Sequence, residues 1–135
     1  MRPYLRLTVL LVTPLLFFAC QGGTPSYPDL QPSEGFLEDK ENIAVGHALY
    51  EQHCVRCHGK PEEGGPIEKF DPPAPHFVSD RYAGMDSAYL YWRIEEGKNV
   101  EPYLSRGSVM PAWGPHFSEE QIWQLVAYIQ KRARH

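Results

Sequence analysis

The stretch Cys54-Val55-Arg56-Cys57-His58 determines what this chain folds around. Two thiols separated by two residues, with a histidine directly after the second, form the C-x-x-C-H pattern of covalent haem attachment. Cysteines three positions apart near a helix end can each add to one vinyl group of the same porphyrin, and the adjacent imidazole then lies beneath the iron. The pattern predicts one haem c, held through thioether bonds by Cys54 and Cys57, with His58 as an axial iron ligand.

The same cysteines allow three other interpretations, and the surrounding sequence favours none of them. A thiol redox pair is expected in a βαβ context, and the chain shows no convincing strand pattern. A structural zinc site needs a second pair of ligands at metal spacing. A structural disulfide leaves the adjacent His58 without a role. Colour distinguishes all three from the haem interpretation. A protein without haem would be colourless even after expression with the haem-attachment machinery.

Three amphipathic helices are predicted around the motif, over about residues 39–55, 86–96 and 119–132. The second is bounded by Asp86, a preferred N-cap residue, and by Gly97, a preferred C-terminal stop. Long segments rich in Pro and Gly join the helices, and loops of this length in a small domain are expected to wrap something. We therefore predict an all-α fold of three or more helices, wrapped with long loops around one haem.

The third helix has the clearest end signals in the chain. Ser118 and Gln121 form a capping-box pattern at its start. Acidic side chains in its first turn, and Lys131, Arg132 and Arg134 at its end, complement the helix dipole.

The sixth iron position is assigned to Met110. Met1 is removed with the signal, which leaves Met85 and Met110, and only Met110 lies in a loop that Pro111 and nearby glycines can shape. A methionine ligand is typical of electron-transfer cytochromes and raises the reduction potential. The alternatives are Met85, a histidine such as His76 or His116, and an open site.

Residues 1–19 carry the pattern of a secretory signal. Two arginines precede a largely apolar run that is too short for a membrane span, which needs about 20 residues. Ala19 then precedes Cys20, which resembles a bacterial lipoprotein signal in which the cysteine becomes the lipidated first residue. Ordinary cleavage near Ala19 and an uncleaved anchor are the alternatives. Residues 20–38 are predicted to be a flexible Pro- and Gly-rich tether, followed by the haem domain over 39–135.

The charge balance excludes one class of partner. The chain has 13 Lys and Arg against 17 Asp and Glu, and removal of Arg2 and Arg6 with the signal takes the formal charge from −4 to −6. Binding to nucleic acid phosphates needs clustered basic side chains, so nucleic acid is not an expected partner.

From about Asp39 to Arg132 the chain resembles class I cytochromes c. The resemblance rests on pieces that occur in the family's order, namely Gly46 and Tyr50, Cys54 to Gly59, Gly65-Pro66, Met110-Pro111-Ala112-Trp113, and a terminal helix that contains Leu125-Val126-Ala127-Tyr128-Ile129. The first loop, with Asp71-Pro72-Pro73-Ala74-Pro75, is most similar to bacterial members akin to the c-type domains of terminal oxidases.

The resemblance implies where several side chains lie. The first and last helices would cross near Gly46, with Tyr50 packed against Leu125 and Tyr128. The carbonyl of Pro66, or alternatively of Pro75, would accept a hydrogen bond from His58 Nδ1, and Pro66 is favoured.

Two tryptophans are candidates for the haem pocket. Trp113 and Trp92 would line it or reach a propionate through the indole N–H, with a plain core role as the alternative.

These features together predict an exported electron carrier rather than an enzyme. One C-x-x-C-H motif means one haem. The protein is expected to carry electrons between redox proteins of respiratory membranes. It would do so on the periplasmic side, attached by a lipid anchor at Cys20. Two alternatives remain open, an electron-transfer subunit of a larger respiratory complex and a gas-binding haem protein with an open iron site.

Overall fold

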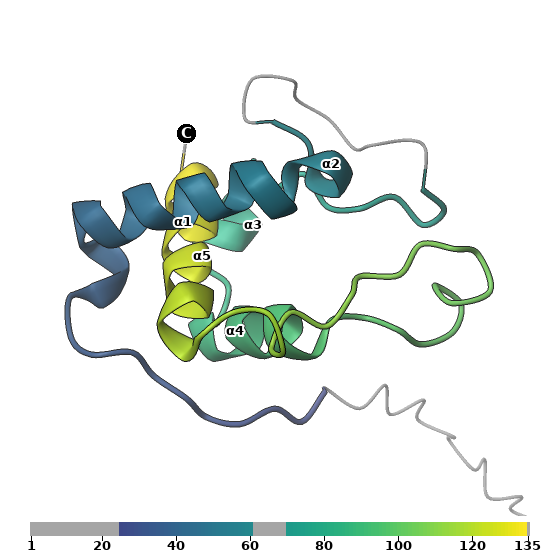
Figure 1. Cartoon of the computed structure of the whole chain (residues 1–135), viewed down its shortest axis with the longest axis horizontal. Helices are drawn as coiled ribbons and strands as arrows, with labels where there is room; N and C mark the ends of the chain where they lie inside the picture. Colours follow the sequence, from purple (N-terminus) through teal and green to yellow (C-terminus); the bar gives the residue numbers. More distant parts are fainter. Residues whose placement is uncertain (1–24, 61–69, 135) are drawn as a thin grey trace, which may run out of the picture.

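The computed structural model describes residues 25–60 and 70–134, so the predicted signal, Cys20 and Pro66 lie outside the described residues. Within those ranges every regular element is a helix, and an isolated antiparallel bridge pairs Lys98 with Met110. The prediction of an all-α fold is confirmed. The elements, shown in Figure 1, are η1 (Phe36–Glu38), α1 (Lys40–His53), α2 (Val55–His58), α3 (Asp80–Ala83), α4 (Ser87–Glu96) and α5 (Glu119–Arg132).

The three predicted helices are present, with one difference at the end of the first. Asp39 caps α1 by accepting from two backbone N–H groups, and Ser118 and Gln121 close a complete capping box on α5. The first helix stops at His53 and Cys54 becomes its C-cap, after which α2 begins at Val55. The cysteine motif therefore lies on a separate helical turn, a break that the periodicity of the sequence does not reveal.

Helices α1 and α5 cross at Gly46, which has the close approach that the family resemblance implied. A Cβ atom at Gly46 would lie 1.9 Å from the carbonyl oxygen of Gln124, so only glycine fits there. One turn further along α1, Tyr50 is fully buried and its ring centroid lies 5.2 Å from that of Tyr128. The crossing joins the element that leads into the cysteine motif to the longest buried helix of the domain.

Helix α4 packs on another side of α5. The rings of Tyr91 and Trp123 are 4.5 Å apart, and Leu90 and Ile94 are buried in the same apolar cluster. Almost all of α5 is buried from Ile122 onward, so this helix forms the centre of the core. No helix of the described residues is long and apolar enough to cross a membrane.

The described part of the predicted tether, residues 25–38, contacts the helical body at two places. Tyr27 stacks on Trp92 with centroids 5.8 Å apart, and its hydroxyl donates to Asp86 at 2.6 Å. Phe36 and Leu37 pack against the core. Figure 1 shows the segment running beneath the body from η1 toward the side of α4.

Candidate haem-binding site

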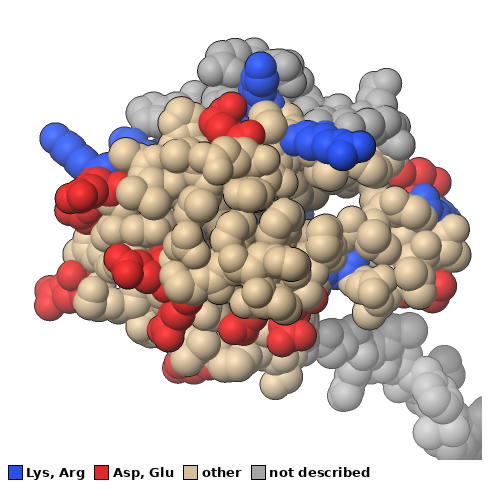
Figure 2. All heavy atoms as spheres, viewed as in Figure 1, with Lys and Arg blue, Asp and Glu red and all other residues tan. Residues whose placement is uncertain are grey.

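A cavity of about 460 Å³ lies between α2, α4, and the loops before α3 and after α4. Cys54, Cys57 and His58 line one part of it, while Met110 and Trp113 line another. Most of the remaining lining is aliphatic or aromatic, including Leu90, Ile94, Leu125 and Ile129. Figure 2 shows the opening as a hollow between the helical body and the loop that follows α4. The structure thus brings the predicted thioether cysteines and both proposed iron ligands to one apolar cavity.

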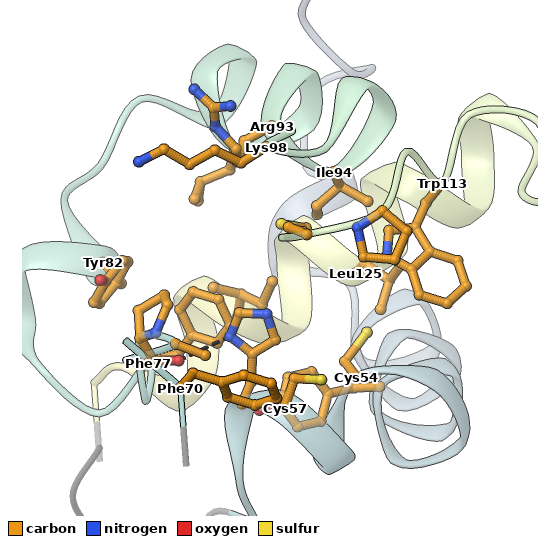
Figure 3. A pocket seen from close by; sticks show the side chains of 18 of the residues that line it. Cys54, Cys57, Phe70, Phe77, Tyr82, Arg93, Ile94, Lys98, Trp113 and Leu125 are labelled. Carbon is orange, nitrogen blue, oxygen red and sulfur yellow. Dashed lines mark hydrogen bonds between the residues drawn. The ribbon is translucent and has the colours of Figure 1, made fainter. Parts of the chain in front are cut away.

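The cavity is lined by cationic side chains, although the chain as a whole is acidic. The described lining includes Arg56, Arg81, Arg93 and Lys98, and contains neither Asp nor Glu. Arg93 Nη1 donates to a backbone carbonyl, but its buried Nε has no partner among the described residues. In Figure 3, Arg93 and Lys98 lie at the end of the cavity away from Cys54 and Cys57. An apolar cavity with thiols at one end and cations at the other is suited to a flat apolar ligand that carries carboxylates.

His58 has one ring nitrogen committed to the protein. Its side chain is 8% exposed, Nδ1 donates to the carbonyl of Pro75 at 2.8 Å, and the ring stacks on Phe77 with centroids 4.7 Å apart. This leaves Nε2 available to a metal, while the acceptor fixes the ring orientation and raises the basicity of the imidazole. Burial lowers the pKa of His58 and so favours the neutral ring, and the hydrogen bond to Pro75 offsets part of this effect.

The acceptor is Pro75 rather than Pro66, which the sequence analysis favoured. The Nδ1 atom of a neutral imidazole carries one proton, so a hydrogen bond to Pro75 leaves none for a second carbonyl. Pro66 lies outside the described residues. Both prolines occur in the same Pro-rich loop, and only its path in space decides which carbonyl reaches the histidine.

The two cysteines are free and half-buried, with Cys54 at the break between α1 and α2 and Cys57 within α2. Burial, with a smaller contribution from neighbouring Cys57, raises the pKa of the Cys54 thiol to about 12. The thiol is therefore uncharged at neutral pH, and the thioether predicted to replace it is uncharged as well. The surroundings suit covalent attachment better than metal binding by thiolates.

The backbone on either side of Met110 is fixed to the end of α4. Lys98 N donates to Met110 O at 2.8 Å, and Met110 N donates back to Lys98 O at 3.1 Å. Gly97 has a φ of 67°, and a Cβ atom there would lie 2.4 Å from Met110 O. Gly97, which was predicted to end α4, therefore also allows the Met110 loop to pack closely against the end of that helix. Met85 lines the same cavity, so its position alone does not distinguish the two methionines.

Trp113 has the pocket position that the resemblance implied, and Trp92 does not. Trp113 lines the cavity and stacks on Phe117 with centroids 5.1 Å apart. Trp92 is not part of the cavity lining and packs between Tyr27 and Arg93.

The predicted alternative histidine ligands do not line the cavity either. His76 is buried, with Nε2 lying 3.0 Å from the carbonyl of Lys60, while His116 is exposed and contacts the edge of Trp113.

Sequence reasoning missed the basic side chains of the cavity. Arg93 and Lys98 lie on either side of Gly97, where α4 ends. Two basic residues around one helix end, in a chain that is acidic overall, were the signal that could have indicated an anionic ligand. It also missed the contact between the two long loops, in which Arg106 pairs with Asp71 at 3.2 Å. That exposed pair contributes little free energy, but it joins the methionine loop to the proline loop.

An all-α domain that places C-x-x-C-H on the wall of a cationic, largely apolar cavity is a cytochrome c-like domain, and this class binds haem c covalently. Residues 41–129 match the family model described as cytochrome C oxidase, cbb3-type, subunit III, and the chain belongs to this family. The cavity fits the group: thiols at one end, a buried imidazole with a free nitrogen, and cations with an unpartnered buried N–H at the other end.

The sequence is also similar to that of a curated respiratory protein. The cbb3-type cytochrome c oxidase subunit CcoP of Azospirillum sp. (strain B510) is 27% identical to this chain over 99 residues. The match covers 70% of this chain and 30% of the relative, so the chain spans less than a third of that protein's length.

Proposed function

We propose that this protein is a one-electron carrier whose single haem c is bound by Cys54 and Cys57 and ligated by His58 and Met110. The observation that carries the proposal is the meeting of the C-x-x-C-H turn and the Met110 loop at one apolar cavity, which no carboxylate of residues 25–60 and 70–134 lines. When bound, the haem supplies an Fe(III)/Fe(II) couple. The protein transforms no substrate, so no residue has a catalytic role.

The side chains around the cavity account for the properties that a carrier needs. Pro75 orients His58 through Nδ1, which keeps the ring in one position in both oxidation states. The bridge between Lys98 and Met110 holds the second ligand loop against α4. Arg93 and Lys98 would neutralise the carboxylates of a bound haem, and the apolar lining would exclude water from its iron.

We further propose that the protein acts on the periplasmic side, attached to the membrane through a lipid on Cys20. The support is the signal-like segment over residues 1–19 that ends immediately before this cysteine. Mass spectrometry of the mature protein tests this directly, since lipidation predicts an N-terminal Cys20 that carries acyl chains. Removal of the lipid by Cys20→Ser should then release the protein from the membrane fraction.

Association with a respiratory oxidase is the second candidate, and the family and the relative named as an oxidase subunit favour it. In that case the protein carries electrons inside a complex rather than as a free carrier. Native electrophoresis of gently solubilised membranes separates the two. Co-migration of haem c from this chain with oxidase activity supports the subunit, and migration as a free small protein supports the carrier.

The visible spectrum of the matured protein, oxidised and reduced, with and without carbon monoxide, tests the ligand set. Sharp low-spin bands that CO leaves unchanged, with the weak far-red band of methionine bound to ferric iron, are expected. A high-spin spectrum or a clear CO shift would contradict the proposal and indicate an open site for gas binding.

A further inference from the structure

Arg132, the last residue of α5, is buried more deeply than a helix-end cation needs to be. Its side chain is 6% exposed, and no carboxylate of the described residues pairs with it. The sequence suggested only a favourable interaction with the helix dipole, which an exposed side chain would provide equally well. Burial of a guanidinium without a counter-charge is costly, so its position calls for another explanation.

The guanidinium contacts groups next to the haem-attachment turn. Nη1 donates to the carbonyl of Gly59 at 3.1 Å, and the Tyr50 hydroxyl donates to the same oxygen at 2.8 Å. Arg132 Cζ also lies 4.8 Å from the centre of the Tyr50 ring. Nη2 also contacts the His76 ring, 3.3 Å from Nε2, a nitrogen that lies 3.0 Å from the carbonyl of Lys60 and donates to it. All of these partners are buried or belong to the backbone.

These contacts involve the residues on both sides of the His58 environment. Gly59 follows His58 directly, and His76 directly follows Pro75, whose carbonyl accepts from His58 Nδ1. Arg132 hydrogen-bonds the first of these neighbours through Nη1 and contacts the ring of the second through Nη2. It therefore packs between the turn that carries the imidazole and the loop that orients it.

We propose that Arg132 is a positioning residue of the redox site, and that its buried cation favours the reduced haem over the oxidised haem. The inference rests on the proposed function, because it requires that His58 binds the iron. Oxidised haem carries one more positive charge than reduced haem, so a nearby cation in a low-dielectric interior destabilises it. A guanidinium remains charged throughout the accessible pH range, which makes this a permanent bias of the reduction potential.

The test is a redox titration of the matured holoprotein, followed by its visible spectrum. Arg132→Gln and Arg132→Met both remove the charge, and the methionine variant guards against a failure to fold because an apolar replacement of a buried ion is often tolerated. Arg132→Lys keeps the charge. Lys131→Gln is the matched control, because it removes an exposed cation from the adjacent position of the same helix.

We expect either neutral variant to raise the ratio of oxidised to reduced haem at a fixed solution potential about tenfold, which is about 59 mV for one electron. Arg132→Lys should recover most of this change, and Lys131→Gln should change the ratio less than about twofold because its charge is in water. The ferric EPR g values, which report on the axial imidazole, should also shift in the neutral variants.

The inference is overturned if the neutral variants change the ratio no more than Lys131→Gln does, or if Arg132→Lys changes it as much as they do. A wild-type protein without the low-spin spectrum would instead refute the proposed function. The two failures are therefore distinguishable in the same set of samples.

Discussion

The two ring nitrogens of His58 illustrate how much of the site is decided at single residues. Nδ1 is committed to the Pro75 carbonyl at 2.8 Å, so that only Nε2 is available to the iron. The motif predicted which histidine would act as ligand, because its role follows from its place after Cys57. Its acceptor could not be predicted in the same way, since the loop contains several prolines and the nearer candidate in sequence, Pro66, is not the one that reaches the ring.

The assignment of Met110 rather than Met85 is also a prediction about single residues. We expect Met110→Ala to abolish the far-red band, to lower the reduction potential and to let carbon monoxide bind the ferrous iron, because it removes the sulfur ligand. Visible spectra with and without CO measure the far-red band and CO binding, and a redox titration measures the reduction potential.

Met85→Ala is the matched control, since both side chains line the same cavity. It should leave ligation and CO insensitivity unchanged. If Met85→Ala opens the iron site and Met110→Ala does not, the assignment of the ligand is wrong.

At the scale of helices, the crossing of α1 and α5 depends on one missing side chain. A Cβ atom at Gly46 would meet backbone of Gln124 at 1.9 Å, and backbone cannot move aside as a flexible side chain can. We expect Gly46→Ala to lower the free energy of unfolding by about 3 kcal/mol, against the gain of up to about 1 kcal/mol that Ala normally brings to a helix. Urea unfolding of the holoprotein, monitored by circular dichroism, measures the change.

Gly84→Ala is the comparison for this effect. Its Cβ atom would meet nothing closer than 3.9 Å, and its φ of −102° is open to any residue. The variant should unfold within about 1 kcal/mol of the wild type. Equal destabilisation by the two substitutions would mean that the crossing can relax, contrary to the geometry.

At the scale of the whole molecule, the haem is expected to be part of the core. A cavity of about 460 Å³ lies between the helices and the loops, and its largely apolar wall would face water without the haem. Small domains bury a smaller share of their surface than large ones, so a bound group contributes a larger part of their stability. We expect Cys54→Ser/Cys57→Ser, which removes both attachment points, to lose cooperative unfolding and most of its helical signal.

Far-UV circular dichroism and urea titration measure this loss. Wild-type chain expressed without the haem-attachment machinery is the matched sample, because it lacks haem but keeps both thiols, and it should behave in the same way. A cooperative transition with full helical signal in either sample would show that the helical core is stable without its ligand.

The chain itself determined the features that local chemistry controls. The C-x-x-C-H motif specified the ligand, because two thiols and an imidazole at this spacing suit one porphyrin edge and its iron. Helix ends were set by Asp39, Ser118 and Gly97, because capping and left-handed backbone are local properties. These signals require no knowledge of distant residues.

Tertiary structure alone decided the features that depend on how distant segments meet. It brought Pro75 to His58 and placed Arg93 and Lys98 at the far end of the cavity from the cysteines. It also buried Arg132 against Gly59, although its sequence position suggested an ordinary exposed helix end. The physical reason is that hydrogen-bond partners, burial and local charge depend on distances in space, which periodicity and composition along one chain do not contain.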